Sequence, residues 1–425
     1  MSISIRILVV ILAVSASVFC EAVAQDGGVN LFDRDRNISV MERPRPEYSS
    51  GGIQRGAFIF TPESRISLEF TDNVFGASVN EESDFIAVFN PTVGVESTWS
   101  RHALTADASV TRREYFDFSD ESVWNYSFGG AGRLDIQRDA YLEAGLRYSS
   151  LTEARTSAGA ANAAAKPIEY DLLNVFVGGR RAFGRLLLQG ELGLDDVDYE
   201  DAPLFGGGVA DQDFRDHEQV KGMVRGDYAL SPDTAVFGRI EVNKRKYDLV
   251  PPAVPTLRDS SGYTIDGGAD FDIRGVARGR VGVGYTEQDY DSAELPDVDG
   301  LSVDALVEWF PTQLTTVTIQ ASRKVRDAPF NNSGGFFATA AGVSIDHELR
   351  RNVIVHAGVS LGEDAYADID RTDERLGINA GVTYFMNRNV GVRVSWNYID
   401  QDSSGTAGNQ EFSRNTVGIS FVFRP

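Results

Sequence analysis

Apolar and polar residues alternate along most of the chain. In the segment 390–398, VGVRVSWNY, the valine, tryptophan and tyrosine side chains fall on one face of an extended strand, and the glycine, arginine, serine and asparagine residues fall on the other. A period of two indicates a β-strand, because successive side chains of a strand point to opposite faces. The same alternation recurs in 141–149, 185–194, 301–310, 353–361, 376–386 and 416–423. The sequence therefore predicts an all-β protein.

The connections between these segments are of two kinds. Very short turns are expected at 100–101, 138–139, 183–184, 231–233, 274–275, 311–312, 350–351 and 387–388. One longer and acidic stretch lies between consecutive short turns, for example at 81–84, 117–122, 195–203 and 363–374. Counted from Phe58, the pattern predicts 18 strands; 16 is the alternative, because the segments 203–220 and 250–265 are ambiguous.

Short turns at one end and long loops at the other are typical of a transmembrane β-barrel. Such a barrel closes on itself, so that no strand edge is left unpaired in lipid. Aromatic residues near the ends of the apolar rows fit the girdles found at the two lipid interfaces: Tyr148, Tyr285, Trp309, Tyr384, Trp396 and Tyr398. We expect a single antiparallel transmembrane barrel with short periplasmic turns and longer acidic extracellular loops. A secreted β-sandwich or β-helix array, which also alternates, is the alternative.

The last strand is predicted to have an assembly role. Phe421 and Phe423 fall on its large apolar face, which we expect to face lipid. A final strand that ends on aromatic residues looks like the terminal signal read by the outer-membrane insertion machinery. The departure from that signal is the extra Arg424-Pro425.

The first 55 residues do not share the alternation. Residues 1–24 have one cation, Arg6, an apolar run over 7–18 and a small-x-small site at 22–24, which predicts a secretory signal peptide that is removed. A membrane anchor is the alternative, but the run is short for a spanning helix. Residues 25–55 form a periplasmic tail or a partial plug, and 56–425 form the barrel. The single cysteine, Cys20, lies in the removed segment, so disulfide and thiol chemistry are excluded.

The composition limits the partners. The 425 residues carry a net charge of -22, which argues against nucleic acid. No stretch after residue 24 is apolar for long enough to form a spanning helix. The expected partners are outer-membrane lipid and lipopolysaccharide, the insertion machinery, and an anionic polysaccharide.

Charged residues on the polar faces are candidates for the lining of a lumen. The nine candidates are Arg133, Arg147, Arg225, Arg239, Arg245, Arg278, Arg280, Glu308 and Arg393. Arginines opposite carboxylates set a transverse field and a size limit in an aqueous channel. The alternative is that they neutralise one another and brace the wall. Barrels of about 16–18 strands are wide enough for an aqueous channel unless they are plugged.

The sequence also resembles a known family. The stretch RPRPEY at 43–48, followed by Gly52-Ile53, Gly56, Phe58 and Pro62, precedes TDNVF at 71–75, and Ser83-Asp84, Pro91 and WSRH at 99–102 follow. This pattern resembles the β-barrel porins of the outer membrane found in alphaproteobacteria, whose members are often associated with surface-polysaccharide loci. The resemblance implies an outer-membrane barrel and a connection with polysaccharide. It brings no catalytic residues.

Enzyme and metal signatures are absent from the sequence. The four histidines, at 102, 217, 347 and 356, form no HExxH motif, which argues against zinc. The acidic stretch 368–374 lacks the glycine and the glutamate of a calcium loop, so the acidic loops are expected to be solvated surface loops. No cofactor is predicted.

Three function classes follow. The first is an aqueous pore, with passage or export of surface polysaccharide as its specific form. The second is a structural barrel that anchors an envelope or polysaccharide assembly. The third is an outer-membrane hydrolase or acyltransferase, which would need a serine beside a histidine at the lipid-facing rim.

Overall fold

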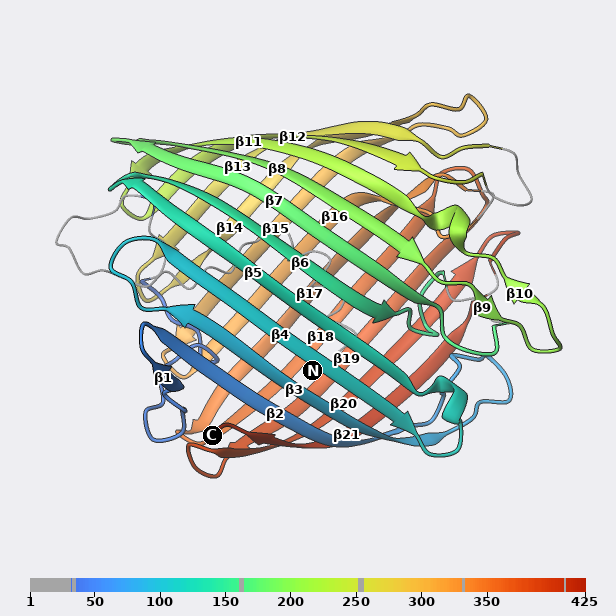
Figure 1. Ribbon diagram of the computed structural model, residues 1–425, viewed down its shortest axis with the longest axis horizontal. Coiled ribbons are helices and arrows are strands. Elements are labelled where there is room, and N and C mark those ends of the chain that lie inside the picture. Colours follow the sequence, from blue (N-terminus) through green and yellow to red (C-terminus); the bar gives the residue numbers. More distant parts are fainter. Residues whose placement is uncertain (1–31, 33–35, 160–163, 251–255, 331–332, 409) are drawn as a thin grey trace.

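The chain forms a closed antiparallel β-barrel (Figure 1). The computed structural model describes residues 32, 36–159, 164–250, 256–330, 333–408 and 410–425, so the predicted signal peptide lies outside the described residues. None of the helices in this part of the chain has the length and apolar character that a membrane crossing requires. The predicted all-β fold class is confirmed.

Within the described residues, the main sheet has 19 strands, of which one is the three-residue β1 (Ile53–Arg55) and 18 are long and form the wall. The wall strands are β2 (Phe58–Thr71), β3 (Asp84–Ser97), β4 (Ala103–Tyr115), β5 (Val123–Gln137), β6 (Ala140–Thr152), β7 (Glu169–Phe183), β8 (Leu186–Tyr199), β11 (His217–Ser231), β12 (Thr234–Tyr247), β13 (Ser260–Ile273), β14 (Ala277–Tyr290), β15 (Val298–Thr312), β16 (Thr315–Asp327), β17 (Gly335–Arg350), β18 (Val353–Tyr366), β19 (Thr372–Phe385), β20 (Val390–Ser404) and β21 (Phe412–Phe423). The short strands β9 (Ala202–Pro203) and β10 (Val209–Ala210) form a separate hairpin, and η1 (Ser119–Glu121) and η2 (Asp213–Arg215) are single 3₁₀ turns. The count of 18 is confirmed and the alternative of 16 is wrong.

The two ends of the barrel differ as the sequence predicts. Seven of the eight predicted short turns overlap a short connection, and the one predicted at 311–312 lies just before the observed connection 313–314, because β15 continues to Thr312. All eight connections lie at one end, which we call the short-turn end. Gly184 and Gly275 hold positive φ angles of 62° and 73° in two of them, a conformation that glycine adopts without steric cost. The longer connections lie at the other end, the loop end, which carries β9 and β10 (Figure 1).

The outward face of the wall is an apolar belt that is displaced toward the short-turn end. On β8 the outward residues are leucine or glycine from Leu186 to Leu194, and then Asp196 and Asp198 follow. On β20 the belt begins at Val390 and gives way to aspartates at the loop end. The wall strands β12 and β14 follow the same order, with lysines or carboxylates only at the loop end. The apolar belt thus reaches the short turns but stops before the strands end at the loop end.

The barrel closes between β2 and β21. Their register joins 64–71 to 416–423, which is shorter than the contact between most other neighbouring strands. Phe421 and Phe423 lie on the exposed outward face, and Ser67 donates a hydrogen bond to Ser420 on the inner face at 2.9 Å. The hairpin partner β1 pairs with the part of β2 that β21 does not reach. Arg424, the departure from the expected terminal signal, forms an ion pair with Glu63 at 2.7 Å and so extends the seam.

A disulfide across the seam tests this closure. Because Ser67 and Ser420 are directly opposite and their hydroxyls touch, we expect the double variant Ser67→Cys/Ser420→Cys to form a disulfide. The oxidised chain would then stay circularised after boiling and migrate differently on a gel until reductant is added. Each single variant is the control. A folded double variant that keeps both thiols free after oxidation, shown by mass, would contradict the β2–β21 pairing.

Candidate functional site

The inner face of the wall is a network of ion pairs. All nine residues predicted to line the lumen lie on the face opposite the apolar belt. Arg147 binds both carboxylate oxygens of Asp107 at 2.6 and 2.8 Å, and Arg239 contacts Asp266 at 2.9 Å. Arg133 pairs with Asp135, and Arg245 pairs with Asp327. Arg393 also has an interaction partner. These contacts brace the wall, and a role in permeation stays a prediction.

Arg278 and Arg280 differ although they share a face of β14. Arg278 contacts Glu308 on β15 and Glu42 of the N-terminal segment, and its side chain is only 17% exposed. Arg280 pairs with Asp270 at 2.9 Å, and its side chain is 43% exposed. Asp270 is also bound by Arg225, which is buried against the ring of Phe237. Arg280 is therefore the arginine of this cluster that is open to solvent in the lumen.

A row of carboxylates crosses β6, β8 and β12 on the inner wall. Glu143 lies opposite Gly178, which lies opposite Glu191, and Met223 separates Glu191 from Glu241 in the same line of the sheet. Glu143 lies directly opposite Arg133 of β5. Cations therefore flank this row, and the inner wall carries charges of both signs here as well.

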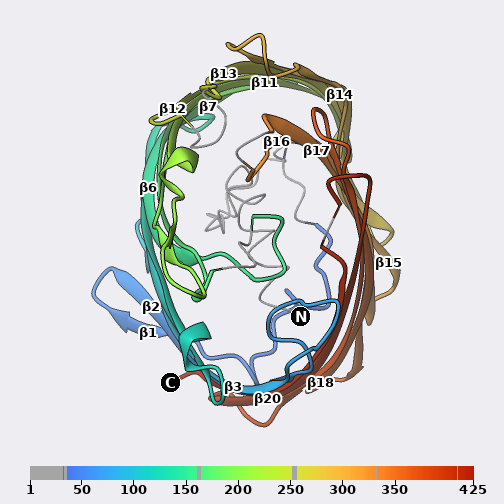
Figure 2. The ribbon, with the colours of Figure 1, turned by 90° about the vertical axis from the view of Figure 1, so that its right-hand side faces the viewer.

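The β6–β7 loop, described over 153–159 and 164–168, folds across the mouth at the loop end (Figure 2). Arg155 binds Glu121 of η1 at 2.5 and 2.9 Å, Glu153 binds Arg215 of η2 at 2.9 Å, and both pairs are largely buried. Gly159 lies beside the β16–β17 loop, since a Cβ built on it would come within 2.9 Å of Pro329. The strands β8, β11, β12, β13, β14 and β15 separate β7 from β16 along the wall. The loop therefore bridges the mouth and narrows it.

A repeated arrangement of tyrosine, arginine and aspartate holds two of the long loops. Tyr199 ends β8, its backbone N–H donates to Asp216 at 2.7 Å, and Arg215 lies 3.8 Å from its ring. Tyr247 ends β12 in the same way. Its backbone N–H donates to Asp259 at 2.8 Å, and Arg258 lies 4.5 Å from its ring. Burial raises the pKa of Asp216 to about 6. These arginines were not singled out in the sequence, and the signal that marks them is an Arg-Asp pair at the end of an acidic loop.

The expectation that the acidic loops are simply solvated is wrong for several of their aspartates. Asp84 accepts the backbone N–H groups of residues 117 and 118, and Asp297 accepts that of Tyr290. These carboxylates satisfy backbone groups where strands end, as turn-forming aspartates commonly do. Other acidic groups remain exposed. The loop end is therefore negatively charged, and its loops are held together by hydrogen bonds to some of these carboxylates.

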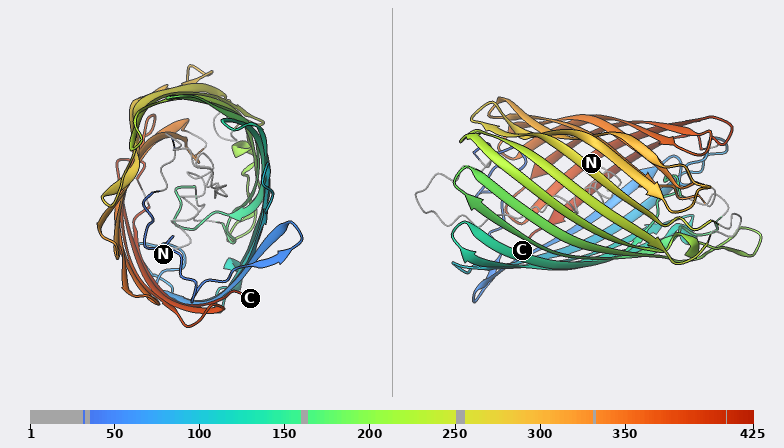
Figure 3. Two further views of the ribbon diagram at one scale, coloured as in Figure 1. Left: turned by 90° about the vertical axis from the view of Figure 1, so that its left-hand side faces the viewer. Right: turned by 90° about the horizontal axis from the view of Figure 1, so that it is seen from above.

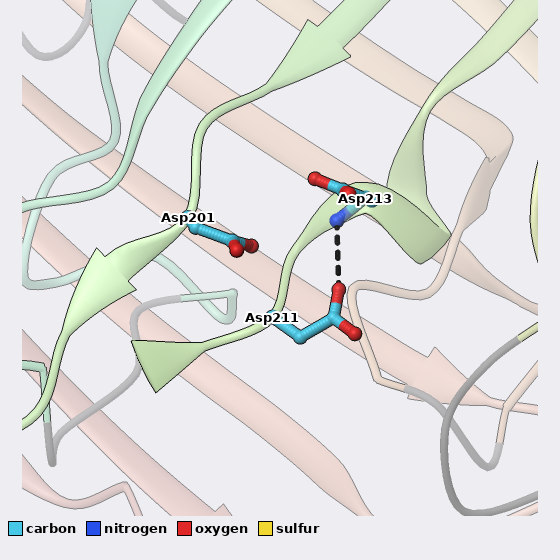
Figure 4. Close-up of side chains that lie close together, drawn as sticks. All are labelled: Asp201, Asp211 and Asp213. Atoms are coloured by element: carbon cyan, nitrogen blue, oxygen red, sulfur yellow. Dashed lines mark hydrogen bonds between the residues drawn. The ribbon is translucent and has the colours of Figure 1, made fainter. Parts of the chain in front are cut away.

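One group of exposed aspartates has the geometry of a candidate cation site. The carboxylate oxygens of Asp201, Asp211 and Asp213 lie within 4.8 Å of one another beside the β9–β10 hairpin (Figure 4). The Asp211 carboxylate accepts the backbone N–H of Asp213 at 3.2 Å. Oxygen ligands of this type suit Ca²⁺ or Mg²⁺. The sequence did not predict a metal ligand here.

The N-terminal segment 36–48 lies against the inner wall near the short-turn end (Figure 3). The backbone N–H of Arg36 donates to the buried Asp272 of β13 at 2.7 Å. Arg43 and Arg45 both pair with the buried Glu348 of β17, at 3.3 and 3.1 Å. Burial raises the pKa of Glu42, but the guanidinium of Arg278 and the amide of Ser39 outweigh burial and leave that pKa below its ordinary value. The segment narrows this mouth. It is thus intermediate between a periplasmic tail and a plug, the two alternatives that the sequence left open.

His356, on the inner face of β18, has two polar partners. His356 Nδ1 contacts Asp346 at 2.8 Å and Nε2 contacts the amide oxygen of Asn379 at 2.7 Å. Within the described residues, no serine hydroxyl bonds to either ring nitrogen of His356. The arrangement lacks the serine partner that a hydrolase would need.

Several solved structures are similar to this chain. OpdL from Pseudomonas aeruginosa gives a TM-score of 0.46 with 10% identity, over 87% of this chain and 99% of OpdL. A mutant of the ferric enterobactin receptor PfeA from Pseudomonas aeruginosa gives 0.46 with 7% identity, over 86% and 80% of the two chains. The FrpB iron transporter from Neisseria meningitidis gives 0.48 with 10% identity, over 84% and 63%. No curated protein matches this chain.

The family model described as "Putative beta-barrel porin 2" matches residues 45–424, which is nearly the whole chain and includes all 18 wall strands. The match begins inside the N-terminal segment and so includes the residues Arg45 and Tyr48 that dock on the inner wall. The chain belongs to this family of β-barrel porins.

Proposed function

We propose that the chain is an outer-membrane pore for small hydrophilic solutes. The observation that carries this proposal is a closed 18-strand wall with an apolar outer belt and a charged, ion-paired inner face. A barrel of this size has room for water in its lumen.

The lumen is narrowed at both ends, which favours small solutes. The β6–β7 loop bridges the loop end, and the segment 36–48 covers part of the short-turn end. Arg280 and the row of Glu143, Glu191 and Glu241 lie between these two constrictions. A solute therefore passes charged groups of both signs, which orient its dipole. The two constrictions limit the size of the solutes that pass.

Export of a surface polysaccharide is the second candidate. The feature that favours it is the arginine-rich short-turn end, with Arg101, Arg274 and Arg388 exposed, which would attract an anionic polymer from the periplasm. A polymer strand would require the β6–β7 loop to move out of the mouth. Steady conductance that an anionic oligosaccharide blocks from the short-turn side would support this form of the function.

Planar-bilayer recording tests the pore and its constriction together. We expect stepwise conductance from the purified barrel, and a higher conductance from the double variant Arg155→Ala/Arg215→Ala. Breaking a buried ion pair by removing one partner costs roughly 3–5 kcal/mol, so this variant should release the β6–β7 loop. Arg112→Ala, on the outward face over Trp124, is the control and should conduct as the native chain does. A folded barrel that gives no steps would refute the pore and favour the anchoring class.

Charge selectivity tests the lining. Replacing Arg280 by glutamate should shift the reversal potential toward cation selectivity at low salt, because the exposed side chain faces the lumen. The shift should fade near 1 M salt, where screening shortens to about 3 Å. Arg112→Glu is the matched control. An unchanged reversal potential in a conducting Arg280→Glu barrel would exclude Arg280 from the conduction path.

Tag labelling tests the location and the orientation. A tag after Gly207, at the exposed tip of the β9–β10 hairpin, should be labelled on intact cells. A tag after Gly184, in the turn between β7 and β8, should be labelled only after the outer membrane is permeabilised. The opposite result would invert the barrel in the membrane.

A further inference from the structure

The short turns share a pattern that the pore function does not use. In five of the eight short turns an exposed apolar residue is followed two positions later by an exposed arginine. The pairs are Trp99 and Arg101, Ile136 and Arg138, Phe183 and Arg185, Leu349 and Arg351, and Met386 and Arg388. The apolar members are between 44% and 61% exposed, although they lie at the ends of a polar-lined barrel. This combination is unusual for a solvated turn and fits a boundary between hydrocarbon and charge.

The apolar belt places these turns at that boundary. Because the belt begins at the first outward residue of strands such as β8 and β20, the hydrocarbon layer reaches the short turns themselves. At the loop end the belt stops earlier, and Asp196, Asp198 and Asp402 project beyond it. The turn arginines are therefore at the height of the lipid headgroups, while their apolar neighbours lie at the height of the acyl chains.

The charge at this rim fits phosphate. The cations of the short turns are all arginine, and none of the chain's lysines falls in a short turn. A guanidinium binds phosphate oxygens through two parallel hydrogen bonds, which an ammonium cannot do. Arg351 has one carboxylate near it, Glu47 at 3.7 Å, but both side chains are more than half exposed, and such a pair contributes little.

One arginine shows how the two side chains combine. Arg181, on the outward face of β7, lies 4.6 Å from the centre of the Phe183 ring, so its guanidinium rests on an exposed aromatic side chain beside the turn. Arginine stems commonly lie along apolar surface in this way and leave the charged head at the polar boundary. The loop end offers the reverse, because its outward carboxylates would repel phosphate directly.

We infer that the short-turn rim is a binding surface for the phosphate groups of phospholipids. The partner is the leaflet that contacts the short turns, with the five arginines on its phosphates and the five apolar side chains among its acyl chains. The inference rests on the proposed membrane location of the barrel. It assigns Arg101 and Arg388 to lipid and not to an anionic polymer, so it favours the small-solute pore over polysaccharide export. Arg280, inside the lumen, is left to the solute.

Native mass spectrometry with phosphatidylglycerol tests this inference. The variant with Arg101, Arg138, Arg185, Arg351 and Arg388 all changed to glutamine should retain fewer phosphatidylglycerol molecules than the native barrel. Each arginine near a lipid surface contributes about a fivefold gain in affinity, so the loss should be large. The matched variant with the same five arginines changed to lysine keeps the charge and should keep part of the lipid. Lys244→Gln/Lys246→Gln, at the loop end, should change nothing.

The outcomes separate this inference from the pore. In one outcome, the native barrel inserts and conducts while the glutamine variant retains as much phosphatidylglycerol as the native chain. In that case the inferred lipid-binding rim is wrong, and the proposed pore function is unaffected. If the native barrel neither inserts nor conducts, the proposed function fails, whatever lipid is retained. A glutamine variant that fails to fold would be replaced by the lysine variant, whose retention must then fall between the native value and the value for detergent alone.

Discussion

The structure depends on one constraint, the closure of the backbone hydrogen bonds around the ring. A strand edge facing hydrocarbon would leave N–H and C=O groups without partners, at a cost of several kcal/mol each. The β2–β21 seam removes that edge, and β1 and Arg424 complete it where β21 is too short. Once the ring is closed, the alternation of each strand determines the rest. Apolar side chains face outward over the height of the belt, and the arginines of the inner face pair with carboxylates there, as Arg147 does with Asp107 and Arg239 with Asp266.

The strands of the wall could be predicted from the sequence because the pattern that marks a strand is local. A period of two and the positions of the short turns are visible in any ten residues, and both agree with the structure from β2 to β21. Many of the ion pairs could not be predicted, because the partners lie on different strands, as Arg239 and Asp266 do, although a few join residues two positions apart, such as Arg133 and Asp135. Arg278 and Arg280 share a face of β14, but the N-terminal segment covers Arg278 through Glu42 and Asn37, both more than 230 residues away, and leaves Arg280 open.

The loops show a different limit of sequence interpretation. Runs of aspartate predicted solvated surface, because charge alone carries no information about backbone groups that need an acceptor. In the structure, Asp216 and Asp259 each accept the N–H of the tyrosine that ends the preceding strand, and the neighbouring arginine covers that tyrosine. The mouth of the pore is therefore built by the residues that end the strands. The β6–β7 loop then adds a bridge that no local pattern marks.

The N-terminal segment has a consequence for the order of events during assembly. Residues 36–48 are synthesised before any wall strand, but their partners Asp272 and Glu348 belong to β13 and β17. The segment cannot complete its contacts until most of the barrel exists. Until then Arg36, Arg43 and Arg45 have no buried carboxylate to bind, and afterwards Arg45 is buried while Arg36 and Arg43 stay partly exposed. Docking of the first described residues is thus a late step, and it distinguishes a finished barrel from one that has stopped part of the way.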